Sequence, residues 1–243
     1  MKKTILIAAI AILSMAFQTN APIPREKHRV KMVIHYLYKD TSEYFYNTDG
    51  HISRIRNAKG YNVSYEYFPG KILRKYADAL RGLNFTDTMT LNKKGLIEKL
   101  TSNNPSTIEQ RRDYNSDKNM TQNKYYDKEG NETTYSACEY LGGNEVSNTM
   151  IDLGNNKTQM TLTSQYYTDK ANTIGNENLG SDFTGSGSKN PIQSSTSRVA
   201  GFPTVIYHFN YHYDSKGRIS IKATYDKDGK LDKLTDSTCY IYY

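Results

Sequence analysis

The stretch 205–219, VIYHFNYHYDSKGRI, decides the fold. Its odd positions from 205 to 213 are Val, Tyr, Phe, Tyr and Tyr, whereas the even positions are mostly polar. Alternation with a period of two places one set of side chains on each face of a β-strand. We therefore expect the aromatic set to face the core. The polar set, which we expect in water, is His208, Asn210 and His212.

The turn motif that ends this stretch recurs several times along the chain. An aromatic residue or Leu is followed by Asp or Asn, two variable residues and Gly, as in 46–52 (YNTDGHI), 91–97 (LNKKGLI), 126–130 (YDKEG), 213–219 (YDSKGRI) and 225–231 (YDKDGKL). The Asp or Asn side chain can accept hydrogen bonds from backbone groups ahead of it, and Gly tolerates the positive φ that closes the turn. The repeat therefore predicts β-hairpins, and their succession predicts an antiparallel meander.

The segments after the turns alternate in the same way. Beyond Gly217, the residues expected on the buried face are Ile219, Ile221, Ala223 and Tyr225, and those expected outside are Arg218, Ser220, Lys222 and Thr224. The least regular segment is 172–203, rich in Gly, Ser and Asn. We interpret it as a crossing connection, either a mobile flap or a functional loop.

The N-terminus predicts export. Lys2 and Lys3 precede an apolar run over 5–13, and Ser14-Met15-Ala16 places small residues where a signal peptidase reads them. We prefer cleavage after Ala16, because Pro22 would follow a cut after Ala21. The chain is then divided into a signal peptide (1–16), a linker (17–29) and a single β-hairpin-repeat domain (30–243).

Charge and composition favour a solvated surface over nucleic-acid binding. Removal of two lysines leaves 30 basic against 25 acidic residues, a net charge of +5, and the basic residues are scattered. A nucleic-acid surface would gather them on one face. The chain has 22 Tyr and no Trp, and tyrosine favours pleated, half-buried strands.

The two cysteines leave two alternatives open. An oxidising compartment permits a Cys138–Cys239 disulfide, which would close a loop of about 100 residues and stabilise the fold by about 4 to 5 kcal/mol in the chain-entropy model. The other alternative is two thiols buried in separate strands.

The hairpin repeats, the signal peptide and the late Asn190-Pro191 loop followed by two hairpins resemble a family of secreted bacterial proteins of unknown function with a porin-like fold. Many of its members are taken to be periplasmic or outer-membrane lipoproteins, but this chain lacks the lipid-accepting Cys. The repeat also resembles the tyrosine-aspartate repeats of large bacterial shell proteins. The resemblance implies an all-β antiparallel meander of repeated hairpins, curled toward an open barrel, and it implies no activity.

No catalytic, cofactor-binding or metal-binding residue is predicted. His208 and His212 share a strand face about 13 Å apart, too far to hold one zinc ion together. The turn 226–229 (DKDG) reaches its Gly two positions too early for an EF-hand loop, and 185–188 (GSGS) has neither the strand nor the helix of a phosphate loop.

The function stays unknown at this level. We expect an exported, non-enzymatic β-protein that binds or scaffolds a partner in the periplasm or at the cell surface, without nucleic acid. A glycan, a cell-surface protein or peripheral association with the outer membrane fits this expectation. The alternatives are an outer-membrane β-barrel, against which short, polar strands argue, and a secreted hydrolase acting on glycan.

Overall fold

The computed structural model describes residues 29–104, 109–228 and 231–243, and the predicted signal peptide and most of the predicted linker lie outside them. Sixteen strands carry the fold: β1 (Val30–His35), β2 (Asp40–Tyr46), β3 (Ile52–Asn57), β4 (Tyr61–Phe68), β5 (Lys71–Asp78), β6 (Leu83–Leu91), β7 (Ile97–Ser102), β8 (Glu109–Tyr114), β9 (Met120–Tyr126), β10 (Glu132–Leu141), β11 (Asn144–Asp152), β12 (Lys157–Tyr166), β13 (Ile192–Val199), β14 (Val205–Tyr213), β15 (Ile219–Asp228) and β16 (Leu231–Tyr242). A single 3-10 turn, η1 (Asp182–Thr184), interrupts the long segment between β12 and β13.

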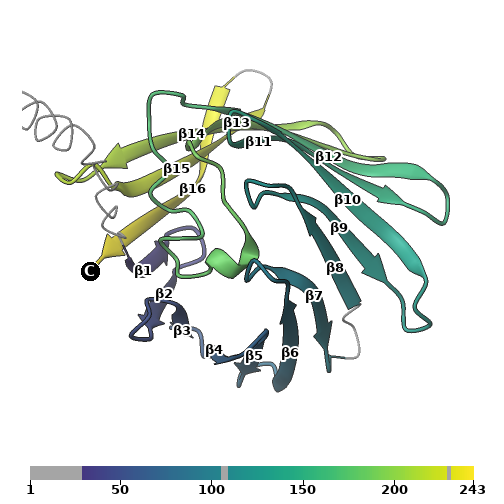
Figure 1. Cartoon of the computed structure of the whole chain (residues 1–243). Coiled ribbons are helices and arrows are strands. Elements are labelled where there is room, and N and C mark those ends of the chain that lie inside the picture. Colours follow the sequence, from purple (N-terminus) through teal and green to yellow (C-terminus); the bar gives the residue numbers. More distant parts are fainter. Residues whose placement is uncertain (1–28, 105–108, 229–230) are drawn as a thin grey trace, which may run out of the picture.

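The strands form an antiparallel meander that closes into a barrel (Figure 1). Each strand pairs with its sequence neighbours, and β1 pairs with β16 through Val33↔Tyr240 and Ile34↔Cys239. The predicted all-β antiparallel meander is confirmed. The barrel is closed, whereas we expected an open one, because the edge strands β1 and β16 pair with each other.

The repeated turn folds as its sequence indicates. The Asp214 carboxylate accepts hydrogen bonds from the backbone N–H groups of Lys216 and Arg218, each at 2.9 Å, and Gly217 has a φ of +73°. In the same way, the side-chain oxygens of Asn47 and Asn92 accept hydrogen bonds from the backbone N–H groups of His51 and Leu96. The turn after β8 has the same geometry with Lys118 at φ +65° in place of Gly, a member of the repeat that the glycine pattern missed.

The two faces of the barrel wall differ in chemistry. On the outer face, cross-strand ion pairs join Glu43 to Arg56 and Glu66 to Lys75, and Lys99 lies 2.7 Å from Glu109. The alternate residues point inward. An apolar cluster lines the inner face of β3 to β7, and it consists of Ile52, Ile72, Met89, Ile97 and Leu100, joined by Phe183 of η1. The inner face of β8 to β11 is more polar, with buried Asn123, Ser136 and Cys138.

The inward orientation of the aromatic residues on β14 is confirmed. Phe209 is buried, whereas Asn210 and His212 are exposed. His208 departs from the prediction, since it is only half-exposed and its Nε2 is buried without a hydrogen-bond partner.

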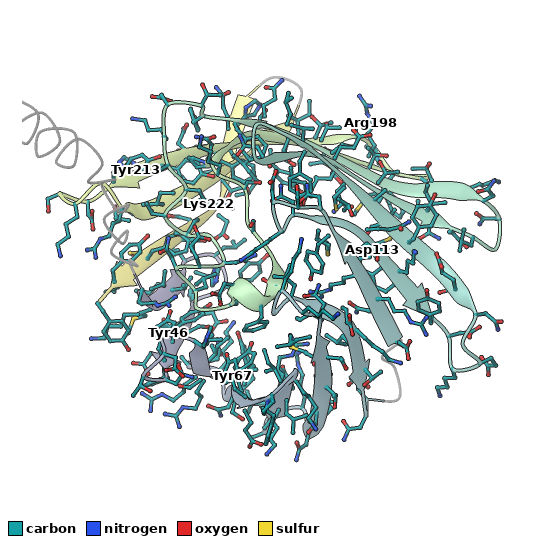
Figure 2. The ribbon with its side chains drawn as sticks, viewed as in Figure 1. Tyr46, Tyr67, Asp113, Arg198, Tyr213 and Lys222 are labelled. Carbon is teal, nitrogen blue, oxygen red and sulfur yellow. The ribbon has the colours of Figure 1, made fainter. Side chains whose placement is uncertain are left out.

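On β15 the predicted burial of Ile219 and Ala223 is confirmed, but the predicted facing of the strand is reversed beyond Ile219. Ile219 is fully buried, but the pairing shifts between His212 and Tyr213, so that Ile221 lies opposite His212 and Lys222 opposite Tyr211. A β-bulge adds one residue to a strand and thereby exchanges the faces of all the residues that follow. Lys222 consequently faces the barrel interior, with its ammonium 4.6 Å from the Phe209 ring centroid (Figure 2).

The predicted irregular segment 172–203 is partly a strand. Residues Ile192–Val199 form β13, which pairs with both β12 and β14. The connection itself is residues 167–191, which we call the strap. It lies at the end of the barrel where β1 begins and β16 ends, and we call this end the strap end.

Both cysteines are free thiols, so the disulfide alternative is not realised. Cys138 is buried on β10, and Cys239 is half-buried on β16. Burial raises the pKa of the Cys138 thiol to about 12, and the nearby Glu145 carboxylate adds to that shift.

Candidate binding pocket at the strap end

The strap is fastened to strands around the rim of the barrel. Its carbonyls accept hydrogen bonds from the N–H groups of Val30 and Ile52, at 3.2 and 3.0 Å. Its own N–H groups at Ser186 and Lys189 donate to the carbonyls of Lys118 and Gly143, and the Thr173 hydroxyl accepts from the N–H of Ile219. These contacts involve both halves of the barrel, so the strap spans its mouth (Figure 1).

The strap is held by one buried aromatic side chain. Phe183 in η1 is 6 % exposed and packs on the apolar cluster of the inner wall. Its ring centroid lies 6.2 Å from those of Tyr65 and Tyr67, at tilted or edge-on angles that favour aromatic pairs. The Gly180 backbone, with a φ of +68°, approaches β3 so closely that a Cβ would stand 2.7 Å from the Ile52 nitrogen. Only glycine fits at that contact.

A pocket of about 570 Å³ lies between the strap and the wall formed by β3 to β7. Its volume falls within the range of small-molecule sites. Ile72, Leu91, Leu96 and Phe183 supply apolar side chains. The remaining lining is polar: His51, Tyr67, Lys94, Lys118, Glu177, Asp182, Ser186 and the glycines 95, 185 and 187.

His51 joins the wall to the strap in this pocket. Its ring stacks on Tyr67 with a centroid distance of 5.4 Å, and its Nδ1 lies 3.2 Å from an oxygen of Asp182. The Tyr67 hydroxyl donates to the Ile52 carbonyl at 2.7 Å, which fixes the ring on which His51 rests (Figure 2). Burial raises the pKa of Tyr67, so this hydroxyl stays protonated.

Two lysines stand over the apolar floor. Lys94 and Lys118 belong to the turns after β6 and β8, and both are exposed. No ion pair among the described residues uses either ammonium group. The carboxylates of Asp182 and Glu177 line the same pocket, and Asp182 lies next to His51. The pocket thus combines an apolar floor with two ammonium groups on the barrel turns and two carboxylates on the strap.

The residues that the sequence singled out have other positions. His208 and His212 lie on the outer face of β14, away from the pocket. The turn 226–229 lies partly outside the described residues. Within the segment 185–188, Gly185 and Ser186 line the pocket. The Ser186 hydroxyl donates to the Asp117 carbonyl in the turn after β8, and the Ser188 hydroxyl accepts from the N–H of Glu145 in β11. Within the part of the chain that the structure describes, no three His, Cys, Asp or Glu side chains gather around a metal position.

Sequence reasoning missed His51 and Phe183. His51 is the residue after Gly50 in a repeated turn, where the pattern shows only hairpin geometry. Phe183 is the single large apolar residue between Leu179 and Pro191, and this isolation in a polar loop was the available signal for an anchor.

Comparison with known proteins identifies the fold class but no family. No family model and no curated protein sequence matches the chain. A solved structure described as a porin-like protein from Bacteroides uniformis superposes with a TM-score of 0.62 at 12 % identity, over 88 % of this chain and 96 % of that one. The TcdB2-TccC3-TEV structure matches with a TM-score of 0.37 at 12 % identity, over 80 % of this chain and 12 % of that one. This similarity is too low to indicate a shared fold. The chain thus shares its β-barrel fold with the structure from Bacteroides uniformis.

Proposed function

We propose that this protein is an exported, non-enzymatic binding protein whose strap-end pocket holds a small amphipathic anion. The apolar body of the ligand lies against Leu91, Leu96 and Phe183, and its anionic group meets Lys94 and Lys118. The observation that supports the proposal is the pocket of about 570 Å³, which has an apolar floor. Above that floor stand the ammonium groups of Lys94 and Lys118, which form no ion pair among the described residues.

The energetics of such a ligand fit the site. Burial of an alkyl chain contributes about 0.8 kcal/mol per methylene, so a short chain supplies most of the affinity. A partly exposed ammonium adds about 1 kcal/mol or less, and it sets the orientation of the anion. The strap lies across this ligand position, because Phe183 and residues 185–187 form one wall of the pocket.

Titration of the mature chain with decanoate, followed by calorimetry, tests the proposal. We expect saturable one-site binding, weakened about fivefold or more by Lys118→Glu because attraction becomes repulsion. The matched control is Lys128→Glu, a turn lysine at the other end of the barrel, which should leave the affinity unchanged. Absence of binding, or equal loss in both variants, would contradict the pocket.

The hydrolase alternative makes a separate prediction. Glu177 and Asp182 are two carboxylates in one pocket, the pair of groups that glycoside hydrolysis needs. We propose that Asp182 instead positions the strap, since its carboxylate lies 3.2 Å from His51 Nδ1 on the wall. Hydrolysis of glycans that disappears in both Glu177→Gln and Asp182→Asn would overturn the non-enzymatic assignment.

The wall argues against an outer-membrane barrel. A lipid-facing wall must be apolar along whole strands. Here the outer face of β2 to β9 carries the ion pairs Glu43–Arg56, Glu66–Lys75, Lys99–Glu109 and Asp113–Lys124. Among the described residues, no helix is long and apolar enough to span a membrane. From the charged outer wall alone, we infer that the mature barrel stays in solution without detergent, which size-exclusion chromatography of the purified chain tests.

Peripheral membrane association is a second candidate, favoured by the end of the barrel opposite the strap. Hairpin tips at this far end expose large apolar side chains: Tyr36, Leu37, Tyr38, Leu80, Leu83, Leu153, Val199 and Phe202. Exposed basic residues stand on or beside the tips: Lys39, Lys59, Arg81, Lys157 and Arg198. Separate apolar tips with basic neighbours match the interface of an anionic bilayer.

Vesicle co-sedimentation tests this second candidate. The protein should pellet with vesicles of phosphatidylglycerol and phosphatidylcholine more than with phosphatidylcholine alone. Replacing Tyr36, Leu37 and Tyr38 together with Ser should abolish pelleting. Phe68→Ser is the matched control, since Phe68 is also exposed but lies at the strap end. Equal pelleting of the triple variant and the control would exclude docking through this tip.

A further inference from the structure

The barrel wall has an incomplete seam between β7 and β8. Among the described residues, two pairs join these strands, Lys99↔Arg111 and Leu100↔Gln110. Extending that register toward the strap end would pair Glu98 with Arg112 and Ile97 with Asp113, but neither pair forms. β8 is fully paired with β9, and β7 pairs with β6 at Ile97 and from Lys99 to Ser102, with a bulge at Glu98. A short length of two facing edges is therefore left without strand partners inside an otherwise closed barrel.

A groove of about 660 Å³ lies along this seam. It is lined by the turn residues Asn92, Lys93 and Lys94, by Glu98 and Lys99 of β7, and by residues 111–114 of β8. Arg111 points outward, next to Glu109, whereas Tyr114 points inward, against Gly185 of the strap. Residues from both faces of β8 therefore line the groove, and Asp113 marks its place on β8 (Figure 2).

The charges in the groove do not cancel. Five lining residues are basic and two are acidic. Lys99 and Arg111 are engaged by Glu109, and Asp113 lies 3.4 Å from Lys124, but Lys93, Lys94 and Arg112 take part in no ion pair among the described residues. The Nε of Arg112 is buried without a hydrogen-bond partner, which leaves a donor in the groove for an acceptor that the chain does not supply.

We propose that the seam binds an extended acidic peptide by strand addition. The peptide backbone pairs with the free edges at 97–98 and 112–114, over about three residues or roughly 10 Å. A carboxylate of the peptide accepts from Arg112, and Lys93 stands at the rim to attract it. An edge with free N–H and C=O groups is a template for another strand, and the basic lining selects an acidic one. This site is distinct from the strap-end pocket, although Lys94 borders both.

A capped hexapeptide of alternating glutamate and valine, with a fluorescent label, probes the seam in the mature chain by fluorescence polarisation. We expect saturable binding. The lysine–valine analogue should bind about tenfold more weakly or worse, because its charge is reversed. A peptide methylated on alternate amide nitrogens keeps the charge but loses the N–H groups, so it should also lose about tenfold. Equal binding of the acidic and the methylated peptides would overturn strand addition.

Variants and hydrogen exchange locate the binding. Arg112→Gln should weaken the acidic peptide about tenfold or more, since it removes a charged donor. Lys128→Gln, at a tip of the far end, should have no effect. Amide exchange at Ile97 and Arg112, whose N–H groups face the seam, should slow on binding, whereas protection confined to other strands would refute the site. Protection of the same amides by self-association without peptide would also refute it. Decanoate binding is the separate readout for the strap-end pocket, and Arg112→Gln should leave it unchanged.

Discussion

Replacement of Phe183 with alanine tests whether one aromatic anchor holds the strap. The ring is 6 % exposed and packs on Ile72, Met89 and the other members of the apolar cluster. Its burial contributes about 2 to 3 kcal/mol, and truncation of buried Phe costs about 3 to 5 kcal/mol when the cavity is included. We expect the lower end, about 3 kcal/mol, because the strap can settle partly into the space.

The loss should appear first as local opening of the strap, because the closed barrel beneath it has its own strand pairing. About 3 kcal/mol corresponds to roughly a hundredfold faster amide exchange at positions that bond only through the strap. The N–H of Ser186, which donates to Lys118, and that of Ile52, which donates to Gly180, are the two reporters. Hydrogen exchange measured by NMR reads both positions.

Phe202→Ala is the matched control, because it makes the same chemical change at a side chain that is 73 % exposed. It should alter stability by about 0.5 kcal/mol or less. If Phe183→Ala leaves the Ser186 amide exchange and the denaturation midpoint unchanged, Phe183 is not an anchor and the strap is held by its hydrogen bonds alone.

Four further outcomes can be measured. Phe209→Ala should lower the denaturation midpoint strongly and His212→Ala hardly at all, since the first is buried and the second exposed; the opposite order would invert the face assignment of β14. Gly217→Val should lower the free energy of unfolding by about 1 kcal/mol or more, because φ is +73° and a β-branched residue disfavours that conformation. A Cβ there would meet no atom, so the effect would come from the backbone alone. The matching change at Gly229 lies outside the described residues. The Cys138 thiol should react with a disulfide reagent at pH 8 only on unfolding, since burial raises its pKa to about 12; rapid modification of the native protein would refute this. Burial opposes ionisation of Asp214, but the hydrogen bonds from Arg218 outweigh it and lower the pKa below 3.8. The stability from Asp214 is therefore present above about pH 4 and is lost as the pH falls through the lowered pKa, so acid titration should show a smaller loss in Asp214→Asn.

Local sequence patterns predicted the hairpins, and they predicted the strand faces where no bulge intervenes. The bonds of Asp214 and the positive φ of Gly217 lie within one turn, and the alternation around Phe209 lies within one strand. Period-two patterning therefore predicted an antiparallel meander, and it predicted the inward aromatic face of β14.

Features that depend on residues far apart in the sequence became visible in the folded barrel. Closure required Val33 of β1 to meet Tyr240 of β16, a pairing that no local pattern encodes. The bulge on β15 turned Lys222 inward, because one extra residue reverses a face and the sequence does not mark it. The pocket joins His51 of an early turn to Asp182 of the strap, and the seam reflects how far β7 and β8 pair. Both candidate sites arise from how the meander closes, so the sequence predicted the barrel wall but not the places where it can bind.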